Sequence, residues 1–436
     1  MSVDVGSEIE LAIEKPAVGG RMLARHHGQV VLVWGAIPGE HVRARVERSG
    51  KGVLYAETTA VLTASDDRRD PGADWRCGGN AFAHIAYTRQ VRLKGEIIRD
   101  TFGRIARVPL ATLPDVIPSP PQGYRMRARL HACEGRLGFF REGTHQLCAP
   151  GPTGQLLPET VDWLGRLERA IAAKGLTGLV GLEVAENMPA DERACHLELH
   201  GCAEVAPWAV LAEVGLLTGL SVSRADRPGA ARLVGQASVS DRVRVGPSGA
   251  GVLTLRRSAC AFFQGNRFLL EPLVRHVAAL VPAGPVVDLY AGVGLFGLSL
   301  AAAGAEDVAL VEGDPVSGAD LVENAAPFAG RARVERCTVE SYLARNQRRT
   351  GSGVSVGACS FIVDPPRTGM SPEALAGVVR ARPTGLVYVS CDIATLARDT
   401  RALIDAGYEF SGVTGIDLFP NTAHVECVTS FVRQTR

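Results

Sequence analysis

The sequence predicts an α/β protein of three consecutive domains: a small OB-like β-barrel, a mixed α+β domain and a doubly wound, Rossmann-like sheet. Residues 1–62 alternate apolar and polar side chains at strand period, with Gly and Pro turns between the runs, which is typical of a small barrel. From residue 271, short apolar strands alternate with helical stretches, which is typical of a mainly parallel sheet. Residues 63–270 mix both patterns, so we expect a separate α+β domain there.

Composition limits the class of protein. The chain has 436 residues, of which 46 % are hydrophobic and 21 % charged, close to the average for soluble globular proteins. The sequence lacks a long apolar run and a secretory signal, so we expect a cytoplasmic protein without membrane contact. Lys+Arg 47 nearly balances Asp+Glu 46, so bulk charge does not indicate a nucleic-acid partner. Ten cysteines without a secretory signal argue against a disulfide framework.

Two sets of arginines lie on predicted strands of the first two domains. One set is in the barrel and the other in the strand YRMRARLHAC: Arg43, Arg45 and Arg48; Arg125, Arg127 and Arg129. The second set shares one face of its strand, because side chains alternate. Either set is suited to contact RNA phosphates, and a solvated strand face explains each about as well. The segment TRQVRLKGEIIRDTFGRIA, by contrast, has the periodicity of an amphipathic helix.

Four strands of the last domain end in polar or reactive residues. The strands VVDLY, VALVE, SFIVD and GLVYVSC end, in this order, at Asp288–Tyr290, Glu312, Asp364 and Cys391. Ligands of doubly wound sheets bind at the carboxyl ends of the strands. We therefore expect these residues to form one site.

The loop after the first of these strands reads Gly292-x-Gly294-x-x-Gly297, and Glu312 ends the next strand. This pattern fits a dinucleotide, with the acid on a ribose, and it fits S-adenosylmethionine equally well. Two features favour the methyl donor. Asp288 precedes the loop, where it could meet the ammonium end of the cofactor, and the sequence DPPR has no purpose in hydride transfer.

Cys391 follows a buried strand at the start of a predicted helix, where backbone N–H groups favour a thiolate. A thiolate that adds to carbon 6 of uracil makes carbon 5 nucleophilic, and a base must later remove the carbon 5 proton. The segment LFPNTAHVECVTSF supplies His424 and Glu426, which alternation places on one strand face. Glu426 is the candidate base. Asp364 is suited to hold the substrate ring or the amine of the cofactor.

Five segments in order, FFQGN, DLYAGVG, DPPRTG, YVSCDIATLARD and FPNTAHVE, resemble those of the RNA uracil-5-methyltransferases. The resemblance implies that Cys391 is the nucleophile and Glu426 the proton acceptor. It also implies four contacts to S-adenosylmethionine, by Gln264, Tyr290, Glu312 and Asp364, beside the glycine loop at Gly292. The barrel resembles a TRAM domain, an RNA-binding module of the ribosomal-RNA members. This implies 23S rRNA, rather than tRNA, as the substrate.

The sequence departs from the family at three places. Asp392-Ile393 follows the nucleophile where Asn-Pro is usual, and Leu295 replaces an Asn that often contacts the cofactor. Many members bind a [4Fe–4S] cluster through four cysteines, of which only Cys77 remains here, with Cys148 a candidate for a second. Two thiolates cannot hold a cluster that needs four. We therefore predict no iron–sulfur cluster and no metal site.

Three alternatives to a 23S rRNA uracil-5-methyltransferase remain open at this point. The first is the same reaction on tRNA. The second is a catalytically silent RNA-binding or assembly factor, which the change at Asp392-Ile393 supports and the intact Cys391 and Glu426 oppose. The third is an NAD-dependent oxidoreductase with an RNA-binding appendage.

Overall fold

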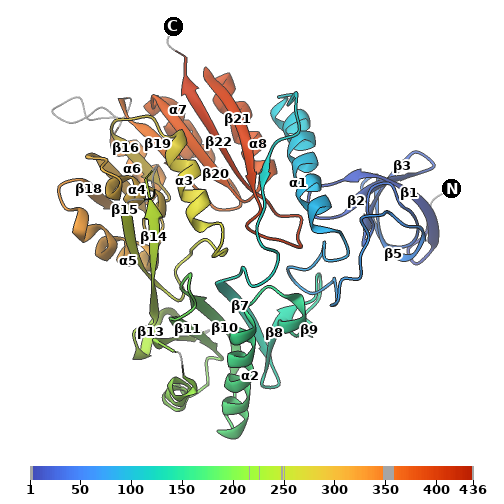
Figure 1. Ribbon diagram of the computed structural model, residues 1–436, viewed down its shortest axis with the longest axis horizontal. Coiled ribbons are helices and arrows are strands. Elements are labelled where there is room, and N and C mark those ends of the chain that lie inside the picture. The colour runs from blue at the N-terminus through green and yellow to red at the C-terminus, as the bar shows by residue number, and fades with distance from the viewer. Residues whose placement is uncertain are drawn as a thin grey trace.

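Figure 1 shows the computed structural model of the chain, which describes residues 3–215, 217–224, 226–246, 249, 251–346 and 358–434. The N-terminal strands form a closed five-stranded barrel in the order β1-β2-β3-β5-β4. Their bounds are β1 (Glu8–Pro16), β2 (Met22–His26), β3 (Gln29–Trp34), β4 (His41–Gly50) and β5 (Val53–Thr63). Inward residues of each strand are buried and outward ones exposed, as the alternation predicts. The predicted barrel is confirmed.

A seven-stranded sheet forms the middle of the chain, in the order β13-β12-β11-β10-β7-β8-β9. The bounds are β7 (Arg127–Cys133), β8 (Arg136–Phe140), β9 (Leu147–Cys148), β10 (Leu179–Glu186), β11 (Arg193–Leu199), β12 (Gly219–Arg224) and β13 (Arg227–Gly235). Helix α2 (Pro158–Ala173) packs on it through a fully buried Trp163 and neighbouring leucines. This sheet lies below the other two parts of the molecule in Figure 1.

The C-terminal part is an eight-stranded sheet in the order β18-β17-β16-β19-β20-β22-β21-β6. Five strands are mutually parallel: β16 (Val286–Leu289), β17 (Val308–Glu312), β18 (Ala332–Arg336), β19 (Ser360–Val363) and β20 (Gly385–Ser390). Next to them β22 (Glu426–Arg433) runs antiparallel, followed by β21 (Tyr408–Ile416) and the short β6 (Val116–Ile117). The predicted doubly wound, mainly parallel sheet is thus confirmed.

Helices cover both faces of this sheet. One face packs against α3 (Leu270–Leu280), α4 (Leu295–Ala302) and α5 (Pro315–Ala325), together with the hairpin β14 (Ser238–Val245)–β15 (Gly251–Ser258). The other face packs against α6 (Val339–Asn346), α7 (Pro372–Ala381) and α8 (Ile393–Asp405). Among the residues that the structure describes, no helix is both long and apolar enough to cross a membrane.

The amphipathic helix predicted in the middle of the sequence is α1 (Tyr87–Thr101), continued by one π-helical turn, Phe102–Ala106. It packs on the C-terminal sheet, because Ile97, Ile98 and Phe102 belong to the same buried cluster as strands β16, β19 and β20. In Figure 1 this helix stands between the barrel and the C-terminal sheet. A segment from early in the sequence therefore completes the core of the last domain.

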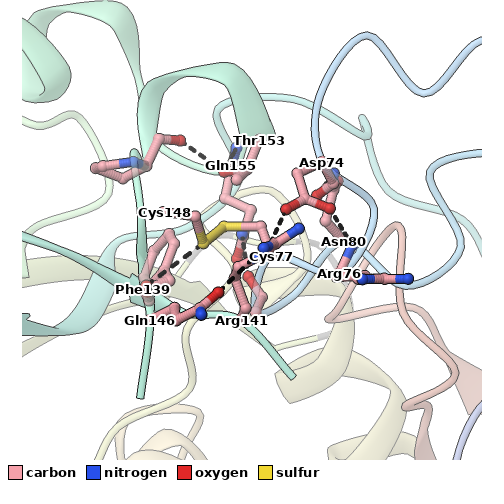
Figure 2. Close-up of a disulfide and its surroundings, with 12 residues drawn as sticks. Asp74, Arg76, Cys77, Asn80, Phe139, Arg141, Gln146, Cys148, Thr153 and Gln155 are labelled. Atoms are coloured by element: carbon pink, nitrogen blue, oxygen red, sulfur yellow. Dashed lines mark hydrogen bonds and ion pairs between the residues drawn. A yellow bond between two sulfur atoms is a disulfide. The ribbon is translucent and has the colours of Figure 1, made fainter. Parts of the chain in front are cut away.

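Cys77 and Cys148 form a disulfide with a Cα–Cα distance of 5.9 Å (Figure 2). It joins the segment after the barrel to strand β9, and an ion pair between Asp74 and Arg141 (2.6 Å) lies beside it. This bond differs from the expectations, which argued against a disulfide framework and gave Cys77 and Cys148 as the remaining candidates for cluster ligands. The eight other cysteines are free. Composition could not reveal the pair, because its members are brought together only by folding.

Candidate active site

The carboxyl ends of the parallel strands open into a cavity of about 610 Å³. Seven of the residues that the sequence analysis assigned to the site line it: Gln264, Tyr290, Gly292, Glu312, Asp364, Cys391 and Glu426. They come from separate segments of the chain, and the strand order β17-β16-β19-β20-β22 places their ends next to one another. These seven residues therefore surround one cavity at this edge of the sheet, and their roles stay predictions.

The glycine loop closes one side of the cavity. Gly294 has φ = 102°, and a Cβ there would lie only 2.4 Å from the side chain of Leu298. Gly297 packs equally tightly on the Asp288 carboxylate, which accepts a hydrogen bond from its amide at 2.7 Å. Both positions need glycine, because any larger side chain would push the loop away from the strand beneath it.

Asp288 itself lies below the loop, fully buried and outside the cavity lining. Burial raises the pKa of its carboxyl to about 8. The expectation that Asp288 meets the ammonium end of the cofactor was therefore wrong, because its side chain points to the amide of Gly297. The sequence does not indicate the direction of the Asp288 side chain, since the local pattern around a strand-end acid is the same whether it faces the ligand or the loop.

Tyr290 and Glu312 shape the cavity wall above the loop. Tyr290 adopts a left-handed backbone with φ = 63°, a conformation that non-glycine residues keep where the surrounding fold requires it. The Glu312 carboxylate accepts hydrogen bonds from the amides of Gly292 (2.7 Å) and Asp314 (2.5 Å). Burial raises the pKa of Glu312, and these amides oppose the shift. The carboxylate is thus held in one orientation.

Asp364 lies at the centre of the cavity and accepts a hydrogen bond from the Gln264 side-chain amide at 3.3 Å. Burial raises the pKa of Asp364 to about 7. Gln264 belongs to the loop that precedes α3, so this contact links that loop to the end of strand β19.

Cys391 and Glu426 stand side by side at the ends of adjacent strands. Ser390 of β20 pairs with Cys427 of β22, which brings the next residues, Cys391 and Glu426, to the cavity edge. Glu426 is 2 % exposed, and burial together with the charge of Asp364 raises its pKa well above the ordinary value. Because β22 runs antiparallel to β20, the first residue of β22 lies at the sheet edge where the parallel strands end.

Burial raises the pKa of the Cys391 thiol to about 12, and the charge of Glu426 adds to the shift. The expectation that the helix N-terminus favours the thiolate was therefore wrong for the free protein. The carboxylate of the next residue, Asp392, caps α8 by accepting a hydrogen bond from the amide of Thr395 (2.9 Å). The departure from Asn-Pro thus keeps a side chain that caps the helix.

Sequence reasoning missed the role of Arg367, which it noted only as part of the sequence DPPRTG. Its guanidinium is hydrogen-bonded to Cys391 and lowers the pKa of both Cys391 and Glu426, in each case against the effect of burial. The signal in the sequence was a cation three residues after the strand-end Asp364.

His424 is not on the same face as Glu426, contrary to the expectation. Strand β22 begins at Glu426, so the alternation does not reach back to His424, which is exposed while Glu426 is buried. The His424 ring lies edge-on to Phe419 at 6.2 Å.

The loop from Asp417 to Val425 leads into Glu426 and is anchored by buried polar contacts to α1. Lys94 of α1 forms a fully buried ion pair with Asp417 and donates a hydrogen bond to the Phe419 carbonyl at 2.9 Å. The Tyr87 hydroxyl also donates to Asp417, at 2.9 Å. Farther along the loop, the side chain of Gln90 bonds both the amide and the side chain of Asn421.

The two sets of arginines have partners within the protein. Arg127 and Arg129 pair with Glu183 and Glu198 of neighbouring strands, while Arg125 donates to the Gln155 side chain at 2.5 Å. Both Arg125 and Arg127 line the cavity, whereas Arg129 is exposed away from it. The three arginines share one face, as expected, and of these only Arg125 and Arg127 reach the cavity.

Cys77 and Cys148 cannot act as thiolate ligands while they are bonded to each other. Across the described ranges, no group of three or more His, Cys, Asp or Glu side chains is arranged to hold a metal ion. The absence of an iron–sulfur cluster remains a prediction.

Two family models match the sequence. Residues 252–434 match the model described as tRNA (Uracil-5-)-methyltransferase, and residues 3–59 match the TRAM domain. A Streptomyces avermitilis protein described as an uncharacterized RNA methyltransferase is 32 % identical, over 97 % of this chain and 98 % of its own. The 23S rRNA (uracil(1939)-C(5))-methyltransferase RlmD of Halomonas elongata is 31 % identical, over 96 % of this chain and 88 % of its own.

A solved structure has the same fold. The tRNA (uracil-54, C5)-methyltransferase of Pyrococcus abyssi, in complex with S-adenosyl-L-homocysteine, superimposes with a TM-score of 0.74. The match covers 97 % of this chain and all of that one, at 23 % sequence identity. It therefore supports the arrangement of all three parts of the molecule.

Proposed function

Because the chain belongs to the RNA uracil-5-methyltransferase family, we propose that it methylates carbon 5 of a uridine in 23S rRNA through a covalent adduct on Cys391. The coarser activity, S-adenosylmethionine-dependent methylation of uracil in RNA, is that of the family. The observation that carries the finer proposal is the pairing of Cys391 with Glu426 in one cavity. We also propose that the three domains divide near residues 62 and 270.

The cavity fits S-adenosylmethionine in size and charge. Its volume of about 610 Å³ is in the range of small-molecule sites, and the carboxylates of Glu312 and Asp364 line it. In the proposal, Glu312 accepts hydrogen bonds from the ribose hydroxyls while the Gly292 loop lies against the adenosyl group. Tyr290, Gln264 and Asp364 hold the amino-acid end. When bound, S-adenosylmethionine supplies an electrophilic methyl group on a sulfonium.

Cys391 acts as the nucleophile in this proposal. Its thiol first loses a proton to solvent, and the sulfur then adds to carbon 6 of uracil, which moves electron density to carbon 5. After carbon 5 has gained the methyl group, Glu426 removes the carbon 5 proton. The bond between carbon 6 and the Cys391 sulfur then breaks, which restores the ring and the thiolate. In the net change, the methyl group moves from the sulfonium to carbon 5, which leaves S-adenosylhomocysteine, the carbon 5 proton moves to Glu426, and the Cys391 thiolate regains a proton from solvent.

The perturbed pKa values assign distinct tasks to the residues around the sulfur. A buried carboxylate with a raised pKa has a high proton affinity, which suits Glu426 to remove a proton from carbon. Arg367 offsets the burial of Cys391 and stabilises the thiolate at the moment of attack. Asp364 is close enough to raise the pKa of both Cys391 and Glu426, so it also belongs to the reacting set.

The choice of 23S rRNA depends on the relatives and on the barrel. Curated relatives from Halomonas elongata and Pseudomonas putida, at 31 % and 29 % identity, are described as 23S rRNA enzymes. The match to a TRAM domain supports an RNA partner. A tRNA substrate is the second candidate, favoured by the overall similarity to the tRNA enzyme of Pyrococcus abyssi.

Three variants test the chemistry. Cys391→Ala should bind S-adenosylhomocysteine like the wild type and transfer no methyl group to RNA. Glu426→Gln should accumulate a protein–RNA adduct that survives denaturing electrophoresis, because elimination stops before the carbon 5 proton is removed. Cys202→Ala, which alters an exposed cysteine of the middle domain, is the control and should retain full activity. Methyl transfer by Cys391→Ala would contradict the covalent mechanism.

Mapping of 5-methyluridine in the RNA of a deletion strain and its parent tests the substrate. Loss of one modified position in 23S rRNA supports the proposal, and loss of a tRNA position supports the second candidate. An unchanged map, with an inactive wild-type protein, would instead identify a catalytically silent RNA-binding factor.

A further inference from the structure

The outer surface of the barrel has two faces that differ in charge. On strands β1 and β4, Glu10 pairs with Arg43 (3.0 Å) and Glu8 with Arg45 (3.5 Å). The register places these residues directly opposite one another. Two of the three barrel arginines noted in the sequence are therefore neutralised, and Arg25 on β2 is likewise paired with Glu14 (3.6 Å). This face is poorly suited to contact phosphates.

The face formed by β2, β3 and β5 carries aromatic and aliphatic side chains instead. The strand pairing sets Leu23 beside Leu32, Leu32 beside Tyr55, and Tyr55 beside Arg48 at the edge of β4. These three apolar side chains point outward and are partly exposed. An exposed apolar row on the outside of a barrel is suited to stacking with flat ligands.

Cations border this row. The Arg48 guanidinium stacks on the Tyr55 ring at 3.3 Å, and Arg21 lies between the rings of Tyr55 (5.5 Å) and Trp34 (5.2 Å). Arg21 is ion-paired with Glu47. In the barrel as the structure describes it, residues 3–63, neither Arg48 nor Lys51 at the next hairpin tip has a carboxylate within ion-pair distance. Aromatic rings interleaved with free cations are typical of surfaces that bind single-stranded RNA.

The same face adjoins the loop that leads to Glu426. A Cβ at Gly20 would lie 3.0 Å from the Trp34 ring and 3.3 Å from Ala423, so Gly20 separates the two by one layer of atoms. Ala423 belongs to the loop that ends at Glu426 and packs against the barrel core. The surface from Trp34 through Arg21 and Tyr55 to Arg48, which we call the barrel strip, therefore begins beside the catalytic loop and leads away from it.

We propose that single-stranded RNA next to the target uridine binds along the barrel strip. Its bases stack on Tyr55 and on the Arg48 guanidinium, and its phosphates contact Arg48 and Lys51. The inference rests on the proposed function, because it takes RNA as the substrate. It adds which face of the barrel meets the RNA, and it excludes Arg43 and Arg45 from that contact.

Fluorescence anisotropy with a labelled oligouridylate of about 20 nucleotides, longer than the ~4–16 that an OB-type barrel covers, tests the barrel strip. Tyr55→Ala should raise Kd by about tenfold, which corresponds to the loss of one stacked base, whereas Tyr55→Phe keeps the ring and should stay within about twofold of wild type. Arg48→Gln should raise Kd and reduce the slope of log Kd against log salt by about 0.7, the contribution of one phosphate contact.

Arg43→Gln is the matched control, because Arg43 lies on the same strand as Arg48 but is already paired with Glu10 on the other face. Its Kd and salt slope should equal those of the wild type. Thermal melting of each variant identifies any that fail to fold. Equal Kd values for wild type, Tyr55→Ala and Arg48→Gln, or weakening by Arg43→Gln to the same extent, would overturn the barrel strip and leave the proposed methylation standing. A wild-type protein that binds RNA through the strip but forms no 5-methyluridine would overturn the proposed function instead.

Discussion

Replacing Lys94 by methionine tests whether its ion pair with Asp417 fixes the loop that leads to Glu426. Both side chains are completely buried, and methionine matches the length of lysine without its charge. The variant leaves the Asp417 carboxylate in the core with the Tyr87 hydroxyl as its remaining side-chain donor, and the Phe419 carbonyl loses its Lys94 donor. Breaking a buried ion pair by removal of one partner costs about 3–5 kcal/mol.

Hydrogen–deuterium exchange of the loop amides, residues 417–425, measures this cost locally. Since about 1.4 kcal/mol corresponds to a factor of ten, the loop of Lys94→Met should exchange about 100- to 4,000-fold faster than in the wild type. We also expect kcat to fall by about tenfold or more, because Glu426 would no longer be held against the substrate carbon.

The control is Lys15→Met, which breaks the partly exposed ion pair between Lys15 and Asp100 of the same helix α1. Such pairs contribute about 0–1 kcal/mol, so exchange should change by less than about fivefold. If Lys94→Met leaves both the loop exchange and kcat at wild-type values, the idea that α1 anchors the catalytic loop is refuted.

Four further predictions concern the sulfur atoms, the pH dependence and the iron content. Burial raises the pKa of Cys391 to about 12, so the thiolate fraction grows as pH rises below that value; kcat/KM measured from about pH 6 to 9 should increase, and a flat or falling profile would argue against attack by Cys391. Arg367→Met should lower kcat/KM at neutral pH by about tenfold, with partial recovery at higher pH, because it removes the cation that favours the thiolate. Cys148→Ser should lower the free energy of unfolding by about 4 kcal/mol, since the disulfide closes a loop with a sequence separation of 71. Reductant should lower the free energy of unfolding of the wild type to the same value. Equal stability of the variant and the wild type without reductant would contradict this prediction. Protein purified without oxygen should contain no iron above background, and about four iron atoms per chain would refute the prediction of no cluster.

The site could be predicted because a parallel sheet brings its strand ends together. Glu312, Asp364 and Cys391 each follow a short apolar strand, so their shared edge is determined by the topology. Glu426 could be predicted only through the need for a base and the resemblance to the family. The antiparallel course of β22, which places it there, does not show in the local pattern.

Features that depend on contacts distant in sequence could not be predicted. The pKa of Cys391 depends on burial, Glu426 and Arg367, and the helix position alone suggested the opposite shift. The sequence does not show that Arg43 is ion-paired, because its partner Glu10 lies on another strand and is brought opposite it only in the folded barrel. Likewise the side chain of Asp288 faces the glycine loop rather than the ligand because of how α4 packs on β16.

The packing of α1 on the C-terminal sheet has a consequence for biosynthesis. Lys94 leaves the ribosome 323 residues ahead of Asp417, and Ile97 and Ile98 precede strands β16, β19 and β20 by roughly 190 to 290 residues. At ordinary elongation rates of about 5–20 residues per second, the apolar face of α1 and the Lys94 ammonium group lack their partners for on the order of 15 to 60 seconds. Until the final strands emerge, the exposed apolar face of α1 is therefore a surface that chaperones can bind.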